Sequence, residues 1–231
     1  MEKDYTLNKD VIEECINYFN WKYKEIEDSL TWFFNRYKKN SNINEVLIKV
    51  TTLNNLYGAG LRNSKDENRD KKKTIDVVTM ASHIVSMNKK IDELLYSKDK
   101  NELIEAYKII ESGFDTEKYK KCYVFASKYC SWHNNDVFPI MDSRVKKELY
   151  KFIISKNNEF NGDESKGGNI GSSGFYEYEL FRSTCIEFRN HVNNFINPPK
   201  EYTLKDLDKF LWVYGEKEDK LNEILNDGFE E

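Results

Sequence analysis

Cysteine is scarce in this chain, and its copies are scattered through the sequence. None forms a C-x-x-C pair, which argues against zinc ribbons and thioredoxin-type redox chemistry. Cys122 and Cys130 lie eight residues apart on a predicted helix, about two turns along it and too far for a disulfide. We therefore expect reduced, buried thiols and no metal site at the four positions, Cys15, Cys122, Cys130 and Cys185.

Proline and long apolar runs are also sparse. The three prolines stand at positions 139, 198 and 199, so long stretches of the chain are free to be helical. No apolar run approaches the roughly 20 residues that a membrane span requires, and the first five residues contain no apolar stretch of the signal-peptide type. We expect a cytoplasmic protein with no membrane partner and no cofactor.

Strand-like alternation of useful length and internal repeats are missing as well. Apolar residues instead recur at helical spacing nearly throughout, with Asn8 as the expected cap of the first helix. The fold class predicted from this pattern is all-α, in one domain over residues 1–231 that could divide into two lobes with a cleft between them. The predicted helices cover residues 11–19, 21–39, 45–57, 74–87, 91–96, 101–112, 117–131, 143–155, 176–195, 204–214 and 217–226.

Two segments have no apolar period and are predicted to be loops. Residues 62–73 are highly charged, which is typical of a mobile connection. Residues 157–174 hold five of the ten glycines together with several serines. That second segment is too long for a simple connector, and its composition predicts a flexible loop or lid.

The charge is unevenly distributed. A net charge of −4 argues against a protein that coats nucleic acid indiscriminately. Residues 117–151, however, contain eight basic and four acidic side chains, so this stretch is locally positive. A basic patch on an acidic body fits local contact with phosphates, although solvated helix faces give similar counts.

The segment from Phe138 to Val145 is the best place to look for an active site. Pro139 fixes the approach of the chain, and its apolar neighbours should bury that approach. Asp142 then stands at the start of a predicted helix. Locally, two interpretations are open: Asp142 is a plain N-cap, which stabilises the helix by about 1 kcal/mol, or it is a buried carboxylate with a chemical role.

The sequence Ile140-Met141-Asp142-Ser143-Arg144-Val145 resembles the V-D-T-H-V element of the helix-hairpin-helix DNA glycosylase superfamily, in which an aspartate begins a helix just after the hairpin. Residues 46–55 are similar to that family's early helix, which ends in L-S-x-Q and wedges a polar side chain into the duplex. Residues 206–215 resemble the closing helix of uncharacterised members. The resemblance spans residues 43–215 and implies a two-lobed helical fold, here with a long Gly/Ser-rich loop, acting on double-stranded DNA that contains a modified or damaged base.

The hairpin itself departs from the family pattern. Family hairpins read L-P-G-V-G-x-K, whereas residues 113–121 contain a single glycine. The resemblance then implies that Lys118 and Lys120 contact phosphates by charge. Lys121, 21 residues before Asp142, falls near the lysine that bifunctional members use to attack the sugar; Lys120 is nearly as good a candidate, and both could be solvated lysines. The iron–sulfur branch is excluded, because the cysteines are not clustered.

The resemblance also implies roles for the remaining candidates. Asp142 would stabilise the positive charge that develops on the sugar and orient or activate water. A flipped base leaves a gap that a wedge fills and needs a pocket that receives it. The wedge candidates are Asn54, Asn55 and Tyr57. The pocket candidates are Tyr129, Trp132 and His133, which lie close to Asp142 in the sequence, together with Trp32 and Phe33, which lie far from it. Arg144 and Lys146 are further candidates for phosphate contact. Each aromatic could instead belong to the core, and His133 could be a simple turn or cap residue.

The preferred hypothesis is a DNA N-glycosylase that leaves an abasic site, with a lyase step if the lysine attacks. The base stays open among oxidised purines, alkylated bases, mismatched thymine and hypermodified phage bases; the 157–174 loop favours a bulky one, such as modified cytosine in invading DNA. One alternative is a helix-hairpin-helix-like module that binds DNA without chemistry. The other is a helical protein-interaction adaptor in which Asp142 is only a cap. A monomer is expected.

Overall fold

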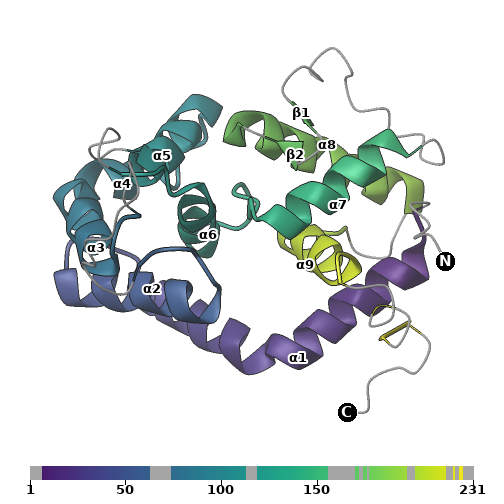
Figure 1. Ribbon diagram of the computed structural model, residues 1–231, viewed down its shortest axis with the longest axis horizontal. Helices are drawn as coiled ribbons and strands as arrows, with labels where there is room; N and C mark the ends of the chain where they lie inside the picture. Colours follow the sequence, from purple (N-terminus) through teal and green to yellow (C-terminus); the bar gives the residue numbers. More distant parts are fainter. Residues whose placement is uncertain are drawn as a thin grey trace. The chain divides into compact units, whose positions relative to one another are not determined.

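The computed structural model describes residues 7–62, 74–112, 119–155, 170–171, 174–175, 177–196, 201–216, 221 and 224–225. Among these residues the chain forms nine helices, α1 (Lys9–Arg36), α2 (Ile43–Leu56), α3 (Val77–Ser86), α4 (Asn88–Leu94), α5 (Lys100–Ser112), α6 (Tyr123–His133), α7 (Ser143–Ile154), α8 (Tyr178–Ile196) and α9 (Leu204–Tyr214) (Figure 1). Two short strands, β1 (Ile170–Gly171) and β2 (Gly174–Phe175), pair antiparallel. The all-α class is confirmed.

Short polar side chains set where the helices begin. Asn8 caps α1, because its Oδ1 accepts from the backbone N–H of Asp10 at 2.9 Å, and Asp76 caps α3 through the N–H groups of Val78 and Thr79. Thr203 forms a capping box with Asp206 at the start of α9. These caps satisfy N–H groups that have no partner within the helix. The helix starts that depend on a local cap were therefore predictable.

One predicted boundary is displaced and another is wrong. The break predicted between residues 19 and 21 lies at Tyr23, where α1 has a kink with non-helical φ −116° and ψ 16°. The helix predicted from residue 117 begins only at Tyr123. The backbone N–H of Cys122 donates to the carbonyl of Glu111 at 3.0 Å, so it is bound to the end of α5 instead of its own helix. The predicted loops at 62–73 and 157–174 and the last predicted helix lie largely outside the described residues.

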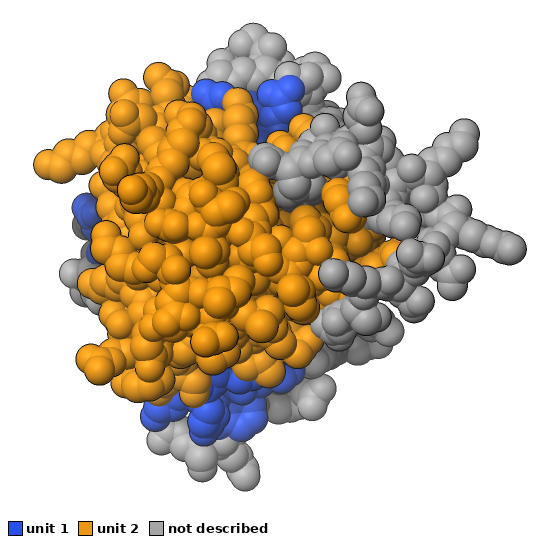
Figure 2. Space-filling model, turned by 90° about the vertical axis from the view of Figure 1, so that its left-hand side faces the viewer, with its two compact units in different colours: residues 1–27, 139–231 blue, residues 28–138 orange. Residues whose placement is uncertain are grey.

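The chain divides into two compact units (Figure 2). Unit 1 comprises residues 1–27 and 139–231, and unit 2 comprises residues 28–138, so α1 contributes to both. In unit 2, α2 packs against α3 and α6, and α5 packs against α4 and α6. In unit 1, α7 and α8 pack against α9.

Aromatic side chains form much of the core, as their abundance predicts. In unit 1 the ring of Phe152 lies 5.3–5.6 Å from the rings of Phe188, Phe210 and Tyr214, centroid to centroid. The four cysteines are buried free thiols, as expected. No helix in the described part of the chain is long and apolar enough to cross a membrane.

Candidate active site

The backbone that leads into Asp142 is anchored within unit 1. The carbonyl of Pro139 accepts a hydrogen bond from the hydroxyl of Tyr178 at 3.0 Å. Ile140 and Met141 are buried, as the apolar sequence predicts. Asp142 is therefore presented from a fixed stretch of chain and not from a freely moving loop.

Asp142 is the N-cap of α7. Its backbone is extended, with φ −97° and ψ 170°, and its Oδ1 accepts from the N–H of Val145 at 2.9 Å. The carboxylate is only partly buried, which corrects the expectation of a buried group: the cap position lies at the helix end, where solvent reaches it. Within the described residues no donor bonds Oδ2. The cap interpretation is thus confirmed in geometry, and one carboxylate oxygen is left over.

Arg144 and Lys146, the predicted phosphate contacts next to Asp142, already have partners in unit 1. The Arg144 guanidinium lies 4.2 Å from the centre of the Trp212 ring and donates to Glu216 Oε1 at 2.8 Å. Lys146 Nζ donates to the carbonyl of Phe175 at 3.3 Å. Burial lowers the pKa of Lys146, and the charge of Asp142 partly opposes that shift. A phosphate would have to replace these contacts.

The three predicted pocket residues lie together on α6 in unit 2, at different depths. Tyr129 has no exposed surface and is a core residue, so it does not line an open pocket. His133 is also buried, and Trp132 is partly exposed. The Trp132 ring packs edge-on against Tyr57 at 5.6 Å and also contacts Phe34 at 5.9 Å. Among the predicted site residues, the structure thus brings Trp132 into contact with Tyr57, and the rings of Tyr129 and His133 lie 5.0 Å apart within α6.

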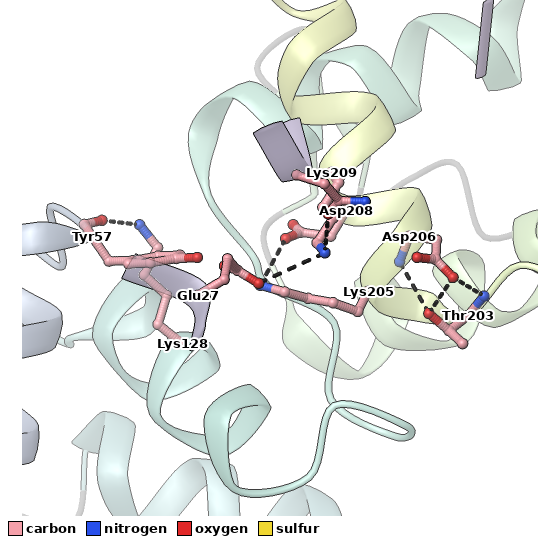
Figure 3. Close-up of polar contacts among 9 residues, drawn as sticks. Glu27, Tyr57, Lys128, Thr203, Lys205, Asp206, Asp208 and Lys209 are labelled. Atoms are coloured by element: carbon pink, nitrogen blue, oxygen red, sulfur yellow. Dashed lines mark hydrogen bonds and ion pairs between the residues drawn. The ribbon is translucent and has the colours of Figure 1, made fainter. Parts of the chain in front are cut away.

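The predicted wedge residues stand at the end of α2. Asn54 Oδ1 accepts from the N–H of Leu61 at 2.8 Å, so this side chain holds the following turn and is not free to insert elsewhere. Asn55 is exposed, whereas the carbonyl of Tyr57 accepts from Lys128 Nζ (Figure 3). Sequence reasoning missed Leu56, whose side chain is 53% exposed beside them. The positive φ of 57° at Gly58 ends the helix immediately afterwards.

The structure describes two of the three lysines that were predicted to contact DNA before α6. Lys118 lies outside the described residues. Lys120 and Lys121 are exposed in the stretch before α6, and Lys121 Nζ lies 3.7 Å from Glu111 Oε2. The structure therefore shows neither lysine in a desolvated position.

Unit 2 also contains a buried polar network that sequence reasoning missed. Lys49 on α2 has no exposed surface, and its ammonium lies 3.2 Å from the carbonyl of Lys39 and 3.1 Å from Asn40 Oδ1. Asn40 Oδ1 also accepts from the Tyr129 hydroxyl at 2.6 Å. The Asn40 side-chain amide donates to Asp92 at 2.7 Å. The carboxylate of Asp92 is thereby linked to the buried cation through one amide.

His133 completes this network. Its Nε2 lies 3.4 Å from Lys49 Nζ, and its Nδ1 lies 3.3 Å from the Tyr96 hydroxyl. Burial and then the Lys49 charge hold the pKa of His133 well below 6.5. Burial lowers the pKa of Lys49 to about 8, although Asp92 and Glu45 oppose the shift. A neutral imidazole beside an ammonium is the consistent protonation state, with Nε2 as the acceptor.

The position of Lys49 could have been noticed in the sequence. It stands among Val46, Val50 and Leu53, on the spacing of three and four residues that marks the buried face of a helix. A lysine in such a stripe must either extend outward or find polar partners in the interior. Its partners could not be foreseen, because they come from α6 and from the stretch after α1.

A second charged cluster joins α1 and α9 within unit 1 (Figure 3). Lys205 Nζ lies 3.3 Å from Glu27 Oε1 and 3.9 Å from Asp208 Oδ2. Lys209 Nζ lies 3.8 Å from Glu27 Oε2 and donates to Asn20 at 2.7 Å. Two carboxylates thus balance two ammonium groups at side chains that are mostly buried, and the cluster attaches α9 to the first half of α1.

Comparison with known proteins gives a family but no activity. A family model named HI_0787_N, described as an N-terminal domain, matches residues 7–137. An uncharacterized protein of Haemophilus influenzae is 31% identical over 138 residues, which are 60% of this chain and 56% of that protein. The chain thus matches little more than half the length of this relative. No solved structure gives a match. The family model covers most of unit 2 and ends five residues before Asp142.

Proposed function

We propose that this chain, which belongs to the HI_0787_N family, is a DNA glycosylase that cleaves the N-glycosidic bond of a flipped damaged or modified base and leaves an abasic site. The observation that carries the proposal is the position of Asp142. It begins a helix after an anchored apolar approach, and its Oδ2 is not bonded among the described residues. This is the arrangement that the resemblance of residues 140–145 to the helix-hairpin-helix glycosylases implies.

The chemistry requires a negative charge beside the sugar. As the bond between C1′ and the base breaks, the electron pair leaves with the base and positive charge develops on the sugar ring. Asp142 is bound to α7 through Oδ1 alone, so Oδ2 can face that charge or accept a proton from the attacking water. The water oxygen then bonds to C1′ and gives its proton to Asp142. The departing base, which keeps the electron pair of the broken bond, takes up one proton, so the products are the sugar with a hydroxyl at C1′ and the protonated base.

Two further features support the proposal. The division into two compact units agrees with a two-lobed glycosylase, and exposed Leu56 beside Asn55 and Tyr57 offers a wedge at the end of α2. An apolar side chain of this kind can fill the gap that a flipped base leaves in the stack. Lys120, which is exposed in the stretch before α6, can make the phosphate contact that the proposal requires.

The direct test is base release. The purified protein is incubated with duplex DNA of differing modification, including phage DNA with modified cytosine, and free bases are measured by mass spectrometry. We expect one modified base to be released and unmodified DNA to stay intact, with heat-inactivated protein as the control. Salt-dependent DNA binding with no base released from any DNA would favour the non-catalytic module; no DNA affinity at any salt concentration would leave only the adaptor.

The lysine has its own test. If Lys121 attacks C1′, the base departs and ring opening gives a Schiff base that borohydride reduces to a stable protein–DNA adduct. We expect this adduct with the wild-type protein and its loss in Lys121→Ala. Lys120→Ala is the matched control, because Lys120 is also exposed and stands next to Lys121. Loss of the adduct in Lys120→Ala alone would assign the attack to Lys120. If the wild-type protein forms no adduct, no lysine attacks the sugar and the base is released by water alone.

A further inference from the structure

An exposed aromatic surface stands at the end of α1 in unit 2. Trp32 is 64% exposed, the largest fraction among the large hydrophobic residues that are exposed in the described chain. Its ring meets Tyr37 edge-on at 6.4 Å, and Tyr37 in turn lies 5.0 Å from Phe33. Exposing an indole forgoes the free energy that its burial would contribute to folding. Most of the Trp32 side chain therefore does not pack in the core of unit 2.

Three exposed cations follow Trp32 in the chain. Arg36 lies one helical turn after Trp32 on the same helix face, and Lys38 and Lys39 follow Tyr37 after the helix ends. None forms a salt bridge with another described residue. The acid nearest along the helix is Asp28, one turn before Trp32. The exposed positive charge therefore follows Trp32 along the chain, and the nearest acid precedes it.

This surface is attached to the rigid interior of unit 2. The carbonyl of Lys39 accepts from the buried Lys49 ammonium at 3.2 Å. The next residue, Asn40, is held by the carboxylate of Asp92 through two hydrogen bonds. Asp92 accepts from the backbone N–H of Asn40 at 3.2 Å and from its side-chain amide at 2.7 Å. The Asp92 carboxylate is thereby directed to Asn40 and not to the exposed cations. The backbone of Lys39 is therefore held in place after α1 ends, while its side chain stays exposed.

We propose that the Trp32–Lys39 surface binds a single-stranded nucleic acid, with an unpaired base stacked on the Trp32 indole and the adjoining phosphates against Arg36, Lys38 and Lys39. Stacking accepts any base, because every base has a π-face, and the cations match the charge of the backbone. The charge complementarity favours a polyanion over an apolar protein partner. This assignment does not depend on base excision or on Asp142.

The test measures binding of fluorescein-labelled dT12, rU12 and polyglutamate to the full chain. Wild type should bind both oligonucleotides and bind polyglutamate much more weakly. Trp32→Ala should weaken oligonucleotide binding about tenfold, and Trp21→Ala is the matched control because Trp21 is the other exposed indole of α1. Replacing Arg36, Lys38 and Lys39 by Gln should reduce the salt slope of log K by about 2, at about 0.7 for each phosphate on single strands.

Several results would overturn the assignment. They are equal affinities of wild type and Trp32→Ala for both oligonucleotides, an unchanged salt slope in the triple variant, or binding of polyglutamate as tight as that of dT12. Loss of self-association in Trp32→Ala, measured by sedimentation, with unchanged oligonucleotide affinity would make the surface a protein interface instead. The ratio of the affinities for dT12 and rU12 shows whether the surface prefers single-stranded DNA or RNA. A chain that releases no base from any DNA but binds dT12 through Trp32 would refute the glycosylase proposal and uphold this one.

Discussion

Asp142→Asn should lower the rate of base release by about 10²-fold or more while leaving the affinity for the same duplex unchanged. The substitution keeps the side-chain oxygen that accepts from Val145, because Asn is as good an N-cap as Asp. It removes only the negative charge and the ability to accept a proton. Single-turnover base release, followed with saturating protein, measures the chemical step separately from binding.

Stability measurements separate this chemical effect from a folding effect. Asp142→Asn should leave the free energy of unfolding nearly unchanged, whereas Asp142→Ala should lower it by about 1 kcal/mol because the cap is lost. Asp76→Asn is the matched control, because Asp76 caps α3 in unit 2 through the same kind of backbone contacts. This substitution should leave the rate of base release unchanged. Full base release by Asp142→Asn would show that Asp142 is a cap and nothing more.

Local signals predicted the helices of this chain well. Asn8, Asp76 and Asp142 each accept from N–H groups two or three residues ahead, so their roles depend on a few neighbouring residues only. The kink at Tyr23 lies close to the break that the spacing predicted between residues 19 and 21. The packing at the kink could not be predicted, because the Tyr23 ring lies 5.4 Å from that of Trp212, far along the chain.

The candidate site was less predictable than the helices. The sequence placed Asp142 correctly at the start of α7, but it could not show that Arg144 is bound to Glu216, 72 residues later. It also placed Tyr129 in a pocket, although the hydroxyl of Tyr129 bonds Asn40 in the core, 89 residues away. Both outcomes depend on long-range pairing, which a local pattern does not encode.

Acid should destabilise the protein through His133. Its pKa is held well below 6.5 in the folded state, so below pH 6.5 the unfolded chain binds a proton that the folded chain does not. Stability from this group is therefore fully present above pH 6.5 and is lost as the pH falls, by about 1.4 kcal/mol per pH unit until the folded pKa is reached. Chemical unfolding at pH 7, 6 and 5 measures the slope.

The groups around His133 make this prediction specific. Lys49 faces its Nε2 from α2, Tyr96 faces its Nδ1, and the carboxylate of Asp92 is linked to Lys49 through Asn40. His133→Gln removes the titrating group and should flatten the slope between pH 7 and 5, whereas His191→Gln, outside this network, should keep it. Lys49→Met removes the cation that helps to lower the His133 pKa, so the loss of stability should end at a higher pH. A slope equally steep in wild type and His133→Gln would assign the acid sensitivity to other groups.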